Sequence, residues 1–174
     1  MNNEKNVLDE LKGKFGEDIT ETSEFAGDLT AAVRPSKWVE ILNFLKIESK
    51  DKYDYMSDLC GVDHNDRNPR FDVVVHLMST GNFKRVRIKT QVEEDEELDT
   101  LSEIWKTANW HEREAFDLLG IRFKDHPNLE RILLPDDFLG HPLRKDYPLK
   151  AEESAKKQEE LRAALKGEKV EADG

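Results

Sequence analysis

The chain has 174 residues, a formal net charge of -11, and 37% hydrophobic residues, which suits one domain with one modest core and an appendage. The charge argues against nucleic-acid binding, which needs clustered Lys and Arg, and against direct docking on anionic lipid. No apolar run approaches the roughly 20 residues that cross a bilayer, and the start, MNNEKNVLDELK, lacks the apolar region of a signal peptide. We therefore expect a soluble, intracellular chain.

Apolar spacing predicts two short helices in the first 50 residues. The first ends near Gly16 and carries Val7, Leu8, Leu11 and Phe15. The second opens at Pro35 and carries an i, i+3, i+4, i+7 stripe of Trp38, Ile41, Leu42 and Leu45. Phe25 to Val33, between them, is a weaker strand candidate.

The next segments alternate as strands do. Tyr53 to Val62 and Phe71 to Met78 are predicted strands, and Gly81-Asn82 indicates a hairpin loop after the second. From Arg85 to Val92 the alternation is strict, with these side chains inward: Val86, Ile88, Thr90 and Val92. The order predicts an α+β fold, an antiparallel or mixed sheet domain with flanking helices.

Cys60 is the single cysteine, which excludes an intrachain disulfide and an all-cysteine iron–sulfur site in this chain. Cys60, Asp63 and His64 form a metal-ligand candidate, but their place at a strand end favours a buried thiol and a polar turn. The His111-Glu112 pair lacks the second histidine of the HExxH zinc motif, because Ala115 stands there. No nucleotide-binding loop or GxSxG elbow appears, so we expect no catalytic, cofactor-binding or metal site.

Helical spacing returns in the second half of the chain. After an acidic run from Glu93 to Glu97, interpreted as a solvated loop, it recurs at Leu98, Leu101, Ile104 and Trp105. A charged helix follows, with Asn109 as its expected N-cap and Gly120 as its left-handed end. A helical wheel places one group of side chains on one side, which allows an Arg113 to Asp117 pair: Trp110, Arg113, Glu114 and Asp117.

Four prolines interrupt the chain beyond this helix and exclude a long regular helix there: Pro127, Pro135, Pro142 and Pro148. The backbone of such an arm must be satisfied by water, by the domain or by a partner. We therefore divide the chain into a domain at 1–124, a proline-rich extended C-terminal arm at 125–149, and a charged tail at 150–174. The tail, rich in Lys, Glu and Ala, is expected to be disordered or a loosely docked helix.

An ordered series of short motifs carries a resemblance to a known family. The series is Glu112-Arg113-Glu114 with Asp117 and Gly120, then His126-Pro127, then Arg131-Ile132-Leu133, then Gly140-His141-Pro142-Leu143-Arg144-Lys145-Asp146-Tyr147-Pro148. It closely resembles the signature of the C subunit of the proton-pumping NADH:quinone oxidoreductase, respiratory complex I. The N-terminal part matches more loosely. Some relatives are fused to the D subunit, and from the length of this chain we expect the unfused form.

The resemblance implies a non-redox subunit of the peripheral arm that packs mainly on the D subunit, which with the B subunit forms the quinone-reducing site. FMN and iron–sulfur clusters then belong to partner subunits, and attachment to the cytoplasmic face of the bacterial membrane occurs only through partners. The isolated chain is expected to be inactive. The residues expected at a partner interface or an internal brace are Trp110, Glu112, Arg113, Glu114, Asp117, His126, Pro127, Arg131, His141, Pro142, Arg144, Lys145, Asp146 and Tyr147.

Several alternatives stay open from the sequence. The charged helix is a solvated face or a buried interface network, and Trp110 on the same face favours the network. Arg144 is the expected clamp for a partner's buried carboxylate, because guanidinium binds carboxylate with two parallel hydrogen bonds. For function, the alternatives are the equivalent subunit of a related membrane-bound hydrogenase and a stand-alone soluble enzyme using carboxylates near Arg113.

Overall fold

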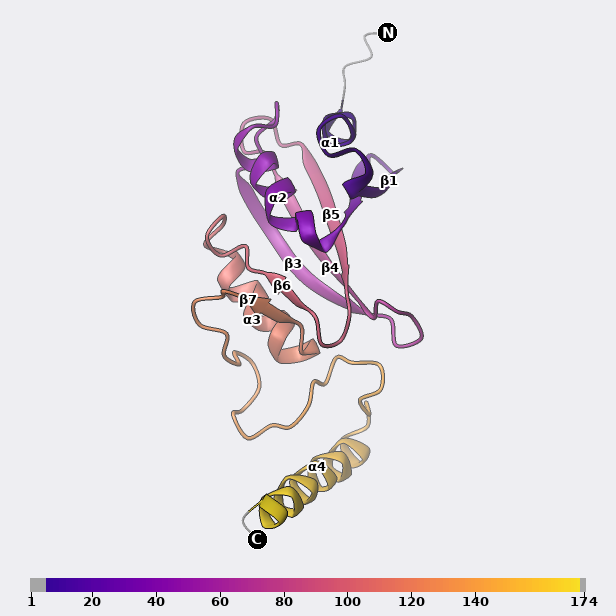
Figure 1. The fold of residues 1–174 in the computed structure, drawn as a ribbon, viewed down its shortest axis with the longest axis vertical. Coiled ribbons are helices and arrows are strands. Elements are labelled where there is room, and N and C mark those ends of the chain that lie inside the picture. Colours follow the sequence, from indigo (N-terminus) through magenta and orange to yellow (C-terminus); the bar gives the residue numbers. More distant parts are fainter. Residues whose placement is uncertain (1–5, 173–174) are drawn as a thin grey trace.

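A five-stranded mixed sheet forms the centre of the protein, in a computed structural model that describes residues 6–172 (Figure 1). The strand order is β1-β2-β5-β4-β3, and all neighbours are antiparallel except β2 and β5, which are parallel. The strands are β1 (Ile19–Phe25), β2 (Asp28–Val33), β3 (Tyr55–Asp63), β4 (Phe71–Met78) and β5 (Arg85–Val92). This confirms the predicted α+β class with a mixed sheet and flanking helices.

The predicted alternation of β5 is confirmed, because Val86, Ile88, Thr90 and Val92 are all buried. The strand predicted at Phe25 to Val33 is confirmed as β2 over Asp28–Val33, but its first three residues differ, because Phe25 ends β1 and a turn follows it. A hairpin stands there, with its turn at Ala26 and Gly27, which both have positive φ angles. β1 was missed because only its first residue is buried, so it carries no apolar alternation.

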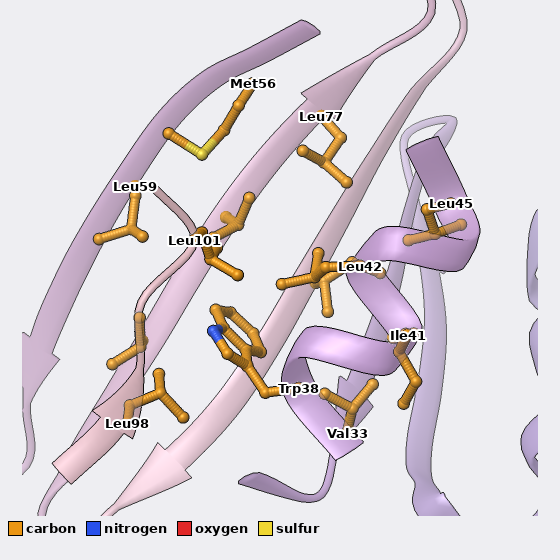
Figure 2. Close-up of a cluster of buried hydrophobic side chains, with 14 of the residues drawn as sticks. Val33, Trp38, Ile41, Leu42, Leu45, Met56, Leu59, Leu77, Leu98 and Leu101 are labelled. Carbon is orange, nitrogen blue, oxygen red and sulfur yellow. The ribbon is translucent and has the colours of Figure 1, made fainter. Parts of the chain in front are cut away.

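Two helices cover one face of the sheet. α1 (Val7–Phe15) begins with a capping box, in which Asn6 accepts from the backbone of Leu8 and Asp9, and η1 (Gly16–Asp18) follows it. Pro35 opens a 3-10 turn, η2 (Pro35–Lys37), before α2 (Trp38–Ile47). The predicted stripe on α2 is fully buried, and Figure 2 shows Trp38 reaching over the strands toward Leu98 and Leu101.

The segment around Leu98 was predicted to be helical, and this is wrong. β6 (Glu97–Asp99) pairs in parallel with β7 (Arg122–Lys124) as a separate two-stranded sheet. Leu98, Leu101 and Trp105 are buried as the apolar pattern requires, but in a short strand and turns. Helical spacing over so few residues does not distinguish these structures.

The charged helix is α3 (Ala108–Leu119), which packs beside the edge strand β3. Gly61 on β3 permits this approach, because a Cβ there would lie 2.5 Å from Cδ1 of Leu119. The arm that follows β7 is irregular up to the tail helix α4 (Ala151–Ala172), which lies at the end of the molecule away from α1 (Figure 1). Of the two alternatives for the tail, the structure has the helix. Within residues 6–172, no helix combines the length and apolar character that a membrane crossing requires.

Candidate functional site

The two ends of α3 define how the arm reaches it. The helix begins at Ala108 with Thr107 at the N-cap position, so the predicted cap at Asn109 is wrong. Its end at Gly120 is as predicted, with φ 77° in the left-handed region. A Cβ on Gly120 would lie 2.6 Å from both Arg144 Nη2 and His141 Nε2. Glycine is therefore required twice, for the backbone angle and for the close approach of the arm.

Asp117 fastens the arm to α3. Its side chain is fully buried, and its Oδ2 accepts hydrogen bonds from the backbone of Ile132, Leu133 and Leu134, at 3.0, 2.8 and 2.9 Å. Its Oδ1 accepts from Arg131 at 2.6 Å. Burial alone would raise the pKa of this carboxyl, but the backbone donors and Arg131 outweigh it and hold the pKa below its usual value. A buried carboxylate with this many donors is a structural anchor.

Residues of the arm also bind the free backbone carbonyl groups at the C-terminal end of α3. His141 Nδ1 lies 2.9 Å from the Asp117 carbonyl oxygen, and burial lowers the pKa of this histidine, so the neutral ring donates there. Arg131 reaches onward to the Gly140 carbonyl at 3.2 Å. The arm's own residues thus satisfy the backbone groups that the helix end leaves open.

Arg113 does not pair with Asp117, so the predicted i,i+4 pair is wrong. It donates instead to the carbonyls of Glu130 and Arg131, both at 3.0 Å, and its guanidinium lies 5.4 Å from the centre of the Trp110 ring. Trp110 itself is 61% exposed. The wheel also misplaced Asp117, which points inward while Trp110 and Glu114 face outward.

Glu112 and His126 form a second buried pair. Glu112 is fully buried and accepts from the Leu101 backbone at 2.6 Å and contacts the Thr100 hydroxyl, so it ties α3 to the segment after β6. Burial raises its pKa to about 7, against the opposing effect of those two partners. His126 Nε2 lies 3.8 Å from Glu112 and 3.1 Å from the Asn109 carbonyl, and its Nδ1 accepts from Asn128. Burial lowers the pKa of His126, so this contact is not an ion pair between charged groups at neutral pH.

The end of the arm is bound to the sheet through Asp63. Arg70 donates twice to Asp63, at 2.7 and 3.0 Å, and once to Asp146, while the Lys145 backbone donates to Asp63 at 2.7 Å. The hydrogen bonds from Arg70 are the main cause of a lowered pKa at Asp63. Burial opposes this effect, and the Lys145 amide adds to it. This polar turn is thus an anchor for the arm.

Arg144 is bound inside the chain, and its expected role as a clamp for a partner's carboxylate stays a prediction. It donates to the Leu119 carbonyl at 2.7 Å and pairs with Glu94. The guanidinium groups of Arg144 and Arg70 lie 5.3 and 5.2 Å from the centre of the Phe71 ring. The acidic run interpreted as a solvated loop therefore contributes a structural carboxylate.

The remaining expected residues divide between interior and surface. Tyr147 is buried, and its hydroxyl contacts Ser154 and Gln158 of α4. Pro142 is half-buried, while the exposed residues are Glu114, Pro127, Lys145 and Asp146. The structure brings most of the set together around the end of α3 and separates Glu112 and His126 into their own pair.

Sequence reasoning missed the roles of Arg70, Phe71 and Glu94, and it placed Asp63 in a polar turn without recognising it as an anchor for the arm. The available signal at Asp63 was a charged residue at an inward-facing strand position. Asp63 lies four residues after Leu59 on β3, so both point to the same side, and both are buried. Glu94 carries no local pattern, because its partners Arg70 and Arg144 are 24 and 50 residues away. Among the described residues, no three His, Cys, Asp or Glu side chains are grouped as metal ligands.

Comparisons with known proteins agree across sequence and structure. The family model described as "Respiratory-chain NADH dehydrogenase, 30 Kd subunit" matches residues 31–153. The chain is 47% identical over 150 residues to the C subunit of NADH-quinone oxidoreductase from Roseiflexus castenholzii, covering 86% of each. It is 49% identical over 140 residues to the protein of that name from Geotalea uraniireducens, covering 80% of this chain and 84% of the relative.

Two solved structures share the fold. The trypsin-resistant fragment (1-134) of Nqo5 is 28% identical with a TM-score of 0.61, covering 71% of this chain and 96% of the fragment. A chain of the membrane-bound sulfane sulfur reductase, an archaeal respiratory membrane complex, has a TM-score of 0.72 over 86% of this chain and 88% of its own. At 21% identity, the second likeness shows the fold alone.

Proposed function

Since this chain belongs to the family of the respiratory-chain NADH dehydrogenase 30 Kd subunit, we propose that it is an assembly subunit that braces the quinone-reactive part of a membrane-bound NADH-quinone oxidoreductase. Its relatives are named as the C subunit of that enzyme. The proposed main partner is the D subunit, with the B subunit next to it. The chain contributes to electron transfer from NADH to quinone, and to the coupled proton translocation, by holding a neighbour in reactive geometry.

The observation that carries this proposal is an exposed aromatic on a rigid support. Trp110 is 61% exposed with Arg113 against its ring, and Leu133 on the adjoining arm is also 61% exposed. Arg113 links the two, because it donates to the carbonyl just two residues before Leu133. Tryptophan and arginine are the residue types that dominate binding energy at protein interfaces. We call these three residues the Trp110 surface.

The support behind the Trp110 surface favours binding. Asp117 holds the backbone of residues 132–134 from the inside, so Leu133 is already ordered before any partner arrives. An ordered surface loses less conformational entropy on association. We therefore infer that the arm is a preformed docking element, with its charges used mainly within the chain.

The redox chemistry in this proposal belongs to the neighbours. FMN and iron–sulfur clusters reside in partner subunits, the isolated chain does not oxidise NADH, and the chain meets the cytoplasmic face of the membrane only through those partners. The single cysteine supports this division, because all-cysteine cluster sites need several thiolates.

The test is purification of the tagged full chain from its own cells, with mass spectrometry of the proteins retained. The proposal expects the D and B subunits of an NADH-quinone oxidoreductase and no NADH oxidation by the chain alone. Retention of a large subunit with nickel-binding cysteines would instead identify the hydrogenase alternative. Turnover by the purified chain, with no partner retained, would identify a stand-alone enzyme and overturn the proposal.

A further inference from the structure

A small apolar groove lies between the edge strand β3 and α3. Its volume is about 90 Å³, and its floor and walls are mostly aliphatic. They are formed by Leu59, Cys60, Gly61, Ala115, Leu118, Leu119 and Leu143. Leu143 is 56% exposed, and Val62, two residues beyond Cys60 on β3, is 40% exposed. The edge of the sheet therefore presents apolar side chains that nothing in residues 6–172 fully covers.

Two carboxylates complete the lining of this groove, Asp58 from β3 and Glu114 from α3. The Asp58 side chain is 48% exposed and lies 3.5 Å from His111 Nδ1, and Glu114 is exposed. Both raise the pKa of the Cys60 thiol, after burial as the larger cause, while Arg87 opposes them. The negative charges of Asp58 and Glu114 are therefore close enough to the groove to affect the Cys60 thiol in its lining. The groove contains no lysine or arginine among its lining residues.

We propose that this groove docks a segment of a neighbouring subunit that inserts one aliphatic side chain and places an adjacent lysine or arginine against Glu114 and Asp58. The volume suits one branched side chain, and the acidic lining supplies the complementary charge. The assignment rests on the proposed function, since it requires that the chain work within a multisubunit assembly. It adds a second contact of defined chemistry beside the Trp110 surface.

Cys60 reports directly on this groove, because it is the only thiol of the chain and lines the groove. The experiment compares labelling of Cys60 by a small maleimide, at mildly alkaline pH, in the free full chain and in the purified assembly. Insertion of a side chain predicts clear labelling of the free chain and strong protection in the assembly. Equal labelling rates in an intact assembly would overturn the groove assignment while leaving the proposed function standing. Failure to obtain any assembly would overturn both.

The charge in the proposal is tested by Glu114→Arg, with Glu24→Arg as the matched control. Glu24 is an exposed acid on β1, the opposite edge of the sheet. Glu114→Arg is expected to weaken retention of the neighbour roughly tenfold and to restore Cys60 labelling, with an unchanged melting temperature of the free chain. Glu24→Arg should change none of these. Retention and protection that match the wild type in Glu114→Arg would overturn the proposed cation.

Discussion

At the scale of single residues, α3 carries two fully buried carboxyl groups whose pKa values are shifted in opposite directions. Asp117 receives three backbone donors and one guanidinium, and its pKa falls below the usual value. Glu112 receives fewer donors at a more deeply desolvated site, and burial raises its pKa to about 7. The number of donors that reach each group decides which effect prevails.

Glu112 should therefore make stability depend on pH. Below its ordinary pKa of 4.5 it is protonated in both states, but between 4.5 and about 7 only the unfolded chain releases the proton, so stability is lost as pH rises through this window. The rise in pKa corresponds to roughly 3 kcal/mol as an upper value. Glu112→Gln keeps an acceptor for the Leu101 backbone and places an amide that does not titrate beside the Thr100 hydroxyl. We would measure the unfolding free energy by denaturant from pH 4 to 8. The value for Glu112→Gln minus that for the wild type should increase up to about pH 7 and then stay constant. A difference independent of pH would refute this assignment.

Arg144 should stabilise the free chain itself. Arg144→Ala removes the donor to the Leu119 carbonyl, the partner of Glu94 and one face of the contact with Phe71. Because its side chain is 17% exposed, we expect a loss of about 1.5–3 kcal/mol in unfolding free energy, the range for hydrogen bonds of charged groups. Arg144→Lys keeps the positive charge but loses the forked guanidinium group. Its unfolding free energy should lie between those of the wild type and Arg144→Ala. Melting curves that overlap with the wild type would return Arg144 to the role of a partner's clamp.

At the scale of elements, sequence predicts what local packing decides. β4, β5 and the α2 stripe follow from apolar periodicity, because each buries its own regular face. β6 and β7 do not, since each is three residues long and depends on a partner more than twenty residues away. The arm gives the clearest case. Local spacing suggested Arg113 with Asp117, whereas both groups bind the backbone of residues 130–134, which no helical period shows.

Gly120 should control how the arm meets α3. Gly120→Ala places a Cβ against His141 and Arg144 at a backbone angle that alanine disfavours, so the arm must move and the chain should lose more than about 1 kcal/mol. Gly13→Ala is the matched control, because a Cβ there meets nothing within 4 Å inside α1, and it should stabilise by about 0.5–1 kcal/mol. Limited proteolysis should cut the arm faster only in Gly120→Ala. Equal cleavage in both variants would contradict the proposed packing.

The tail helix should matter little to the sheet domain. α4 meets the arm through a few polar contacts, chiefly Gln158 with the Leu139 backbone and Ser154 with Tyr147. Truncation after Leu149 should therefore shift the melting temperature of the free chain by no more than a few degrees, since α4 contributes little apolar burial. A larger fall, measured by circular dichroism, would mean that α4 supports the domain.

At the scale of the whole molecule, the regular elements up to β7 are followed by the irregular arm and then by α4. One hydrophobic core joins the five-stranded sheet, α1 and α2 to buried residues of α3, β6 and β7, and the arm and α4 lie toward the other end of the molecule (Figure 1). Three anchors, at Asp117, His126 and Asp63, hold the arm to the domain, so α3 and the arm present one ordered surface. This is the basis for regarding the chain as a preformed adaptor within a larger assembly.

The most direct test of this account compares how well tagged full chains carrying Trp110→Ala or Phe25→Ala retain the D subunit. Phe25 is 83% exposed on β1, at the sheet edge opposite β3 and α3, so it matches Trp110 in exposure without belonging to the proposed interface. The account predicts that Trp110→Ala loses at least about 2 kcal/mol of binding, roughly 30-fold in affinity, while the free chain melts like the wild type. Phe25→Ala should retain this partner fully. Full retention by a folded Trp110→Ala chain would contradict the central claim that α3 and the arm form the docking surface.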